Sequence, residues 1–304
     1  MKDREKLDKL RWRTNQKSEN IVFYSYKISQ HDHINEHEFK RLNHSIKSLR
    51  EFNNEILVYL FCDKPNLVPD HFKSEYSILV RPFVNGFDHD MLSAWSIHRW
   101  YNLKSFERRD CNILYVDSDT IFYDDVQCLF DTYCYYDVYG REEFGFRYDP
   151  NIGGGKKVRD SLDKVDIAIY DLGGKCAIYK YCCGVMLLNN NVHNYIIESL
   201  GELTDLMNEF KMKQQFYPIP NPRIVDQYAI WTILSRLEIM GGLFASQDVT
   251  MGYKEQKHQE HFNPVVLHYT TKGEQELAKS DEKYNDLIRD VDALSADIDP
   301  YSVA

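Results

Sequence analysis

Short, nearly continuous apolar runs alternate with amphipathic stretches through the first 120 residues, and this alternation constrains the fold more than any other feature. Residues 55–63, Glu-Ile-Leu-Val-Tyr-Leu-Phe-Cys-Asp, and residues 112–116, Asn-Ile-Leu-Tyr-Val, are two such runs. Uninterrupted apolar strands are typical of sheets that helices cover on both faces, because neither face of such a strand meets water. The segments 21–26 and 76–80, the latter followed by Pro82, are further candidate strands.

Helices are predicted between these strands. Residues 36–52 have the pattern of an amphipathic helix, and a second helix is predicted over 91–106, with Trp95, Trp100 and Leu103 toward the core. This alternation predicts an α/β fold with a mostly parallel, mixed sheet flanked by helices on both faces. In such sheets, ligands bind beyond the carboxyl ends of the strands.

The second half of the sequence is less regular. Residues 137–184 contain glycine clusters and are predicted to be irregular. A strand is predicted over 265–269, and helices are predicted over 195–211 and 225–237. We therefore expect an N-terminal extension over 1–19, one domain over 20–273, and an acidic C-terminal helix and tail over 274–304.

Charge and cysteine usage exclude several classes of protein. The formal net charge is −10 and the sequence has no long run of Lys or Arg, so a nucleic-acid partner is not expected. The seven cysteines form no Cys-x-x-Cys pair, which favours reduced thiols and a cytoplasmic location. The sequence has no run of about 18 apolar residues, so no transmembrane segment is expected.

The most informative motif follows the run at 112–116 directly. Asp117 and Asp119 are two residues apart at the end of a predicted strand, so their carboxylates point to the same side. Such a pair can bind a hard divalent cation, which in turn binds two phosphates and offsets the charge on a departing diphosphate. Acidic pairs are common, but the preceding strand makes this one more specific.

Tyr115-Val-Asp-Ser-Asp-Thr120 resembles the metal-binding motif of GT-A-fold glycosyltransferases, especially the glycogenin-like and lipopolysaccharide galactosyltransferase-like enzymes. Further segments of the sequence resemble other parts of these enzymes, in the same order along the chain. Residues 94–104 resemble the helix that precedes the motif, and residues 183–189, Cys-Gly-Val-Met-Leu-Leu-Asn, resemble a segment that borders the sugar. Asp226-Gln227 and the histidine of Val266-Leu-His268 complete the likeness.

The resemblance implies a single GT-A, Rossmann-like domain with Mn²⁺ or Mg²⁺ as cofactor. It assigns Asp117, Asp119 and His268 to the metal, and it places Asp226 and Gln227 near the transferred sugar as catalytic residues. The residues that it implies for donor binding are Arg99, Asp117, Ser118, Gly184 and Lys272.

Two departures from the family pattern are present. His268-Tyr-Thr-Thr-Lys-Gly273 stands where the glycogenin-like branch has His-x-x-Gly-x-x-Lys-Pro-Trp, which affects the placement of Lys272. Cys183 stands where a Ser or Thr is usual, so any hydrogen bond from that position is weakened.

The implied reaction transfers a hexose from a nucleotide-diphosphate sugar, with UDP as the expected nucleotide. The acceptor is a carbohydrate, a lipid-linked glycan or a protein. Asp226-Gln227 stands where retaining relatives keep polar groups, which favours retention of configuration. Asp171 or Glu142 could instead act as the base of an inverting enzyme.

Other interpretations remain open at this level. A phosphohydrolase of the haloacid-dehalogenase type, a nucleotidyltransferase and a non-catalytic GT-A domain are the alternative functions. Individual residues also have structural alternatives: a packed His268, a salt-bridged Arg99, a helix-capping Asp226 and an exposed Gln227.

Overall fold

The computed structural model describes residues 18–30, 33–84, 94–142, 165–213, 225–251 and 264–268. Lys272, the predicted tail over 274–304 and most of the predicted extension over 1–19 lie outside these ranges. Within them, every helix is too short or too polar to cross a membrane. All seven cysteines are described, and each has a free thiol, which agrees with the expectation of reduced cysteines.

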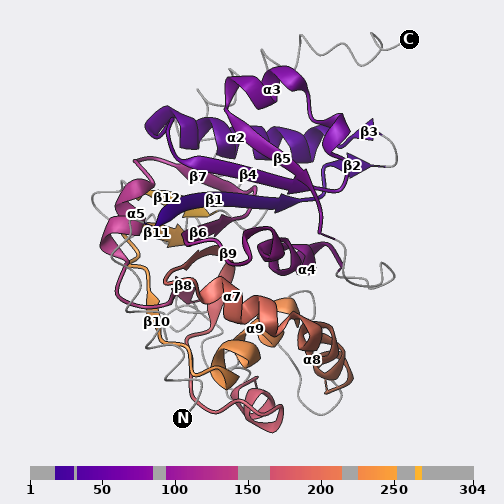
Figure 1. The fold of residues 1–304 in the computed structure, drawn as a ribbon, viewed down its shortest axis with the longest axis vertical. Helices are drawn as coiled ribbons and strands as arrows, with labels where there is room; N and C mark the ends of the chain where they lie inside the picture. Colours follow the sequence, from indigo (N-terminus) through magenta and orange to yellow (C-terminus); the bar gives the residue numbers. More distant parts are fainter. Residues whose placement is uncertain are drawn as a thin grey trace, which may run out of the picture.

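A seven-stranded sheet forms the centre of the molecule, in the order β10-β8-β9-β6-β1-β4-β5 (Figure 1). β1 pairs in parallel with β4 and β6, whereas β9 runs antiparallel to its neighbours β6 and β8. The mostly parallel, mixed sheet predicted from the sequence is therefore confirmed. Its strands are β1 (Glu19–Tyr26), β4 (Leu57–Cys62), β5 (Ile78–Pro82), β6 (Cys111–Val116), β8 (Val138–Glu142), β9 (Tyr181–Leu188) and β10 (Gly241–Leu243).

Two smaller sheets accompany it. One joins β11 (Val249–Met251), β12 (Val266–His268) and β7 (Thr120–Phe122), and the other pairs β2 (Ser29–Gln30) with β3 (His33–Ile34). Because β7 begins four residues after β6 ends, the three-stranded sheet lies next to the carboxyl end of a central strand.

Helices lie on both sides of the central sheet (Figure 1). On one side are α2 (Glu36–Phe52), the short 3₁₀ helix η1 (Pro65–Leu67), α3 (Asp70–Glu75) and α5 (Gln127–Thr132). On the other are α4 (Ala94–Tyr101), its 3₁₀ continuation η2 (Asn102–Phe106), α7 (Val192–Glu198), α8 (Leu200–Lys213) and α9 (Val225–Arg236). The predicted flanking of both faces is confirmed.

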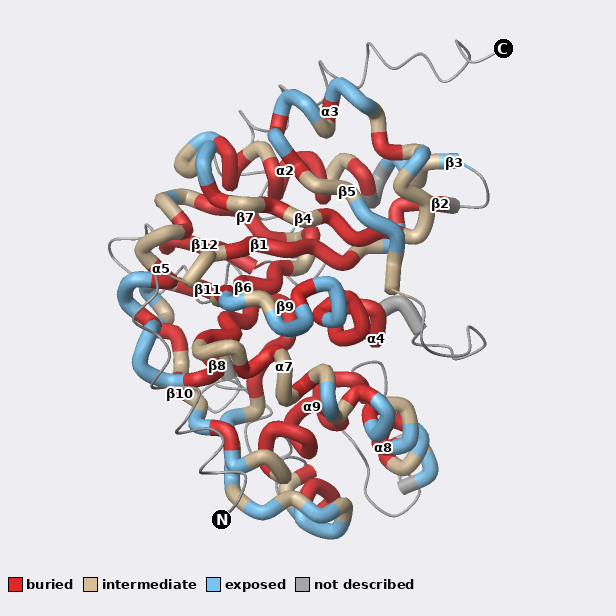
Figure 2. The backbone as a smooth tube through the Cα atoms, in the orientation of Figure 1, coloured by how far each residue is buried: buried red, intermediate tan, exposed pale blue. Residues whose placement is uncertain are grey.

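β1 contributes to a hydrophobic core on each face of the sheet. Ile21 and Phe23 pack among the side chains of the α4, α7, α8 and α9 layer, whereas Val22 and Tyr24 pack toward α2 and α3. All four side chains are at most 1% exposed. Alternate side chains of a strand point to opposite faces, so a strand buried on both sides must be apolar throughout. Figure 2 shows these central strands as buried.

Several predicted elements differ in detail. The predicted helix over 195–211 is two helices, because α7 ends before Ser199 and α8 begins after it. The segment 137–184, predicted to be irregular, contains β8 and a helical stretch over 165–171. The sequence of β8, Val-Tyr-Gly-Arg-Glu, has a weak strand pattern because Gly140 interrupts it. The fold uses that glycine, since a Cβ there would lie 2.8 Å from the Tyr181 ring.

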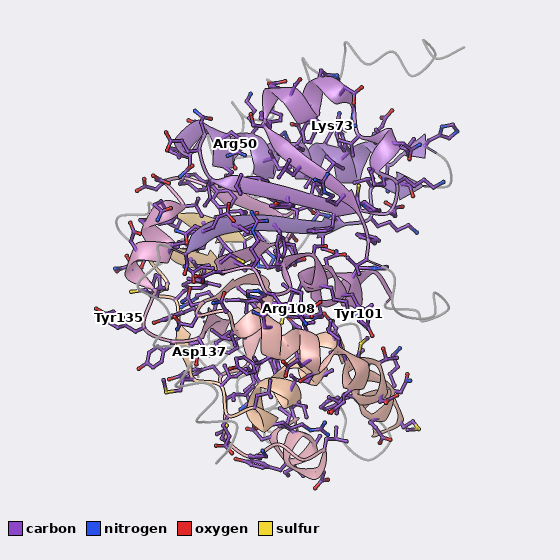
Figure 3. All side chains as sticks on the ribbon, in the orientation of Figure 1. Arg50, Lys73, Tyr101, Arg108, Tyr135 and Asp137 are labelled. Carbon is purple, nitrogen blue, oxygen red and sulfur yellow. The ribbon has the colours of Figure 1, made fainter. Side chains whose placement is uncertain are left out.

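Arg50 connects the end of α2 to the edge of the sheet (labelled in Figure 3). Its guanidinium donates hydrogen bonds to the carbonyl oxygens of Asn53, Ile56, Tyr76 and Ser77. Only 8% of Arg50 is exposed, so these carbonyls replace the water that a guanidinium would otherwise bind. The contacts hold α2 in position over the sheet.

His193 on α7 is a fully buried titratable group. Its Nε2 lies 3.0 Å from the carbonyl oxygen of Phe106, and burial lowers its pKa to about 4. The neutral ring can donate from Nε2 to that carbonyl. A proton on Nδ1 would have no acceptor among the described residues.

We expect His193→Gln to reduce the loss of stability in acid. In the wild type, His193 binds a proton near pH 6.5 when unfolded but only near pH 4 when folded. The free energy of unfolding should therefore fall by roughly 2 to 3 kcal/mol from this group between pH 7 and pH 4.5. Glutamine keeps a donor for Phe106 but does not titrate. Urea unfolding of both proteins at the two pH values measures the difference, and equal losses would contradict the assignment.

Candidate active site

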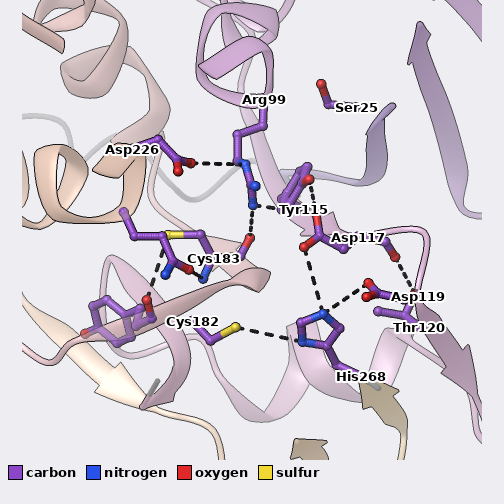
Figure 4. A network of polar contacts seen from close by, with 12 residues as sticks. Ser25, Arg99, Tyr115, Asp117, Asp119, Thr120, Cys182, Cys183, Asp226 and His268 are labelled. Atoms are coloured by element: carbon purple, nitrogen blue, oxygen red, sulfur yellow. Dashed lines mark hydrogen bonds and ion pairs between the residues drawn. The ribbon is translucent and has the colours of Figure 1, made fainter. Parts of the chain in front are cut away.

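Asp117 lies directly after β6, where the chain leaves the sheet (Figure 4). Its backbone N–H donates to the Gly184 carbonyl on β9 at 2.7 Å, and its carbonyl oxygen accepts from the Thr120 hydroxyl at 2.8 Å. These bonds fix the turn between β6 and β7, which contains Asp119. Both aspartates therefore lie at the carboxyl end of a central strand, as the sequence predicts.

β12 brings His268 to the same turn, although it is 149 residues from Asp119 in the sequence. The strand pairs antiparallel with β7, with His268 opposite Thr120. His268 Nε2 lies 3.1 Å from Asp119 Oδ1 and 3.8 Å from Asp117 Oδ2. One ligand atom from each of the three side chains lies within 4.8 Å of the others. Two carboxylates and an imidazole suit Mn²⁺ or Mg²⁺, so the residues present fit a divalent metal.

Two residues of β9 hold the imidazole ring of His268. A Cβ at Gly184 would lie 2.1 Å from Cε1 and 2.6 Å from Nε2, so the ring occupies the space that a side chain would need. At the other ring nitrogen, Cys182 Sγ lies 3.8 Å from Nδ1. The ring is thus oriented with Nε2 toward the carboxylates and Nδ1 toward the thiol, the arrangement in which Nε2 can bind a metal.

Arg99 on α4 is a buried cation, 6% exposed, beside this cluster (Figure 4). Its NH1 donates to the Cys183 carbonyl at 2.8 Å and lies 3.5 Å from Asp117 Oδ1, while its Nε lies 3.5 Å from Asp226 Oδ2. Burial disfavours the charged guanidinium, but Tyr115, Asp117 and Asp226 outweigh this effect and place the pKa of Arg99 above its usual value. Arg99 is therefore permanently charged.

Tyr115 completes the surroundings of Asp117. Its hydroxyl donates a hydrogen bond to Asp117 Oδ1, and the Arg99 guanidinium lies 5.0 Å from the centre of its ring. Burial raises the pKa of Tyr115 well above its usual value, so the phenol remains a donor. The side chain thus orients one Asp117 oxygen.

The first turn of α9 supplies Asp226 and Gln227. Gln227 Oε1 accepts a hydrogen bond from the Cys183 backbone N–H at 2.6 Å, and Asp226 pairs with Arg99. The positive end of the helix dipole favours a carboxylate at this position. Gln227 is 5% exposed, so its alternative interpretation as an exposed helix residue is wrong. Asp226 lies within α9, and its ion pair with Arg99 on α4 connects the two helices.

No protein-family model and no curated protein matches the sequence, whereas solved glycosyltransferase structures match the fold. The galactosyltransferase LgtC, in complex with donor and acceptor sugar analogues, aligns with a TM-score of 0.54 at 14% identity, over 88% of this chain and 94% of LgtC. GlyE from Streptococcus pneumoniae gives 0.51 at 17% identity, over 85% of this chain and 56% of GlyE. The bifunctional WbbM gives 0.52 at 13%, over 85% of this chain and 47% of WbbM.

The chain has the GT-A glycosyltransferase fold. The resemblance predicted from the sequence is confirmed at the level of fold. The chain spans about half the length of GlyE and WbbM and nearly all of LgtC.

The GT-A fold brings most of the predicted site residues into one contact network: Arg99, Asp117, Asp119, Gly184, Asp226, Gln227 and His268. Ser118 lies in the same turn, with 3% of the residue exposed. Lys272 lies outside the described residues. The roles of all these residues in binding and catalysis remain predictions.

Sequence reasoning missed Arg41 on α2. Its NH2 lies 3.1 Å from Asp119 Oδ2. Further along the same helix, Ser45 shares a hydrogen bond with the Thr120 hydroxyl at 2.7 Å, and Ser48 accepts one from the Phe122 N–H at 3.0 Å. Polar residues at 41, 45 and 48 follow helical i, i+4, i+7 spacing. This polar stripe is the sequence signal that could have indicated Arg41.

The electrostatic surroundings keep Asp119 ionised. Burial alone would raise its pKa, but His268 and Arg41 have a larger, opposite effect, so the pKa of Asp119 lies below its usual value. A carboxylate must be ionised to bind a metal, and Asp119 meets this condition.

We expect Gly184→Ala to weaken Mn²⁺ binding by about 10- to 100-fold, because the new methyl group must displace the His268 ring. Electron paramagnetic resonance of free Mn²⁺ measures the affinity directly. Gly201→Ala on α8 is the matched control, since a Cβ there meets nothing within 4 Å. It should bind Mn²⁺ like the wild type. Unchanged affinity in Gly184→Ala would remove His268 from the ligand set.

Proposed function

We propose that this chain is a metal-dependent glycosyltransferase that transfers a hexose from a nucleotide-diphosphate sugar, with UDP as the nucleotide. The acceptor is a carbohydrate, a lipid-linked glycan or a protein. The GT-A fold supports glycosyl transfer, and the LgtC structure contains donor and acceptor sugar analogues. The observation that carries the proposal is the convergence of Asp117, Asp119 and His268 at the end of β6. The free cysteine thiols support a cytoplasmic location.

Each of the clustered side chains has a role in this proposal. Asp117, Asp119 and His268 hold Mn²⁺ or Mg²⁺, which when bound offsets charge on the departing diphosphate. Arg99 adds a fixed positive charge beside the donor, and its ion pair with Asp226 orients the Arg99 guanidinium. Rigid, preorganised charges of this kind stabilise developing negative charge more than mobile water does.

Retention of configuration fits the polar residues at the start of α9. An inverting enzyme needs a carboxylate to take the acceptor proton, whereas a retaining enzyme of this fold lets the leaving diphosphate assist. LgtC has a glutamine in its active site, which one solved structure replaces with glutamate. We assign the corresponding position to Gln227, which its bond to Cys183 holds against β9.

Asp171 is poorly placed to act as an inverting base. It borders a surface hollow together with Gly173, Glu202 and Arg236, at the C-terminal end of α9. Asp226 is in the first turn of the same helix, ten positions before Arg236, which corresponds to about 15 Å along the helix. The side chain of Glu142, the other candidate base, lies outside the described part of the molecule.

A donor panel tests the reaction class. With Mn²⁺, UDP-hexoses should be hydrolysed slowly, GDP- and CDP-sugars less, and EDTA should stop the reaction. Asp117→Ala combined with Asp119→Ala should lower the rate at least about 100-fold, because the metal contributes several kcal/mol to the transition state. Asp70→Ala, which removes a carboxylate with 97% of its side chain exposed on α3, is the control. Donor binding without nucleotide release would instead indicate a non-catalytic GT-A domain. Hydrolysis of phosphate esters would indicate a phosphohydrolase.

The stereochemical prediction is tested on the first product formed. An α-linked donor should give an α-linked product, which proton NMR of the anomeric signal identifies. Gln227→Ala should lower kcat by about 10- to 1000-fold with a smaller effect on KM, if the amide acts near the reacting carbon. A β-linked product would contradict retention and would direct the search to an inverting base.

A further inference from the structure

β7 is an edge strand of the small three-stranded sheet, since among the described strands it pairs with β12 alone. Helix α2 lies along its other edge. The Ser48 hydroxyl accepts a hydrogen bond from the Phe122 N–H at 3.0 Å, and the Ser45 hydroxyl bonds to the Thr120 hydroxyl at 2.7 Å. Two serine side chains of α2 thus take the place of a neighbouring strand.

Ser45 and Thr120 belong to a chain of three buried hydroxyl groups. The Tyr24 hydroxyl on β1 bonds to Ser45 at 2.9 Å, and Ser45 bonds to Thr120. Thr120 in turn bonds to the Asp117 carbonyl oxygen at 2.8 Å (Figure 4). Tyr24, Ser45 and Thr120 are all fully buried. Each hydroxyl therefore depends on these partners and not on water.

The carbonyl at the end of this chain fixes the direction of its hydrogen bonds. A carbonyl oxygen only accepts, so the single Thr120 hydroxyl proton points to Asp117 and Thr120 accepts from Ser45. The Ser45 proton is then engaged, so Ser45 accepts from the Tyr24 phenol. Burial raises the pKa of Tyr24 well above its usual value, which keeps that phenol protonated. Each hydroxyl thus supports the next, from the core toward the turn.

The last bond of the chain acts on the peptide unit between Asp117 and Ser118. The Asp117 N–H is bound to the Gly184 carbonyl, so the backbone of Asp117 is held at both of its polar groups. Thr120 also stands opposite His268 in the ladder of β7 and β12. One threonine therefore connects the backbone that bears the carboxylates to the strand that bears the imidazole.

We propose that Thr120 and Ser45 are positioning residues for the candidate metal site, and that the hydroxyl chain holds the two carboxylates at the spacing that a divalent cation requires. The proposal rests on the proposed function, which assigns the metal to this site. It has a directional consequence. Loss of the Thr120 hydroxyl removes the bond to the turn itself, whereas loss of the Tyr24 hydroxyl leaves that bond in place.

Thr120→Val keeps the branched shape of the side chain but removes its hydroxyl. It should lower the Mn²⁺ affinity about 10- to 100-fold, measured by electron paramagnetic resonance of free Mn²⁺. The spectrum of the bound ion should also change, because the ligands have moved. Thr120→Ser keeps the hydroxyl and should restore both the affinity and the spectrum. Ser45→Ala should have an intermediate affinity, since Thr120 loses its donor but keeps its bond to Asp117.

Tyr24→Phe is the matched control, because it removes a hydroxyl from the opposite end of the same chain. It should lower the urea midpoint of unfolding about as much as Thr120→Val and leave the Mn²⁺ affinity unchanged. If every variant loses stability but keeps the wild-type Mn²⁺ affinity, the chain supports only the fold. If Tyr24→Phe weakens Mn²⁺ binding as much as Thr120→Val, the effect does not follow the direction of the chain. Both results would overturn the proposal, whereas a wild-type protein that binds no Mn²⁺ would overturn the proposed function.

Discussion

The rest of the site depends on the ion pairs and the hydrogen bond that the buried Arg99 guanidinium makes. A charge at 6% exposure is costly unless opposite charges and hydrogen-bond acceptors surround it. Asp117, Asp226 and the Cys183 carbonyl provide these partners from β6, α9 and β9. Arg99 therefore joins the helical layer below the sheet to the end of the strand that bears the aspartates. Removing either carboxylate would leave this buried charge only partly compensated.

The small sheet of β7, β11 and β12 makes the second half of the site. Its ladder places His268 opposite Thr120, and the absence of a side chain at Gly184 leaves room for the ring. Side chains held by strands and helices keep a ligand geometry more accurately than side chains on loops. The site thus has a candidate metal ligand, His268, fixed by β-pairing and a cation, Arg99, fixed by helix packing. Arg41 on α2 lies on the opposite side.

Much of the fold could be predicted from the sequence. The apolar runs at 21–26, 55–63 and 112–116 are strands because both faces are buried, and Pro82 ends β5 at the edge of the sheet, where a missing N–H costs little. The short strands β8, β10 and β11 could not be predicted. Their three to five residues contain too few apolar side chains for a periodic signal, and their stability comes from neighbouring strands.

The sequence by itself determined the carboxylate pair. Asp117 and Asp119 directly follow an apolar strand that the sequence predicts, although both lie in the turn after β6 and not in extended backbone. Only the tertiary structure decided which residues face that pair. His268 is 149 residues away in the sequence, and its place depends on the register of β12 against β7. Arg41 depends on the packing of α2 against β7. Register and packing result from burial of the whole core, so a local pattern such as the polar stripe on α2 could not place either residue beside the aspartates.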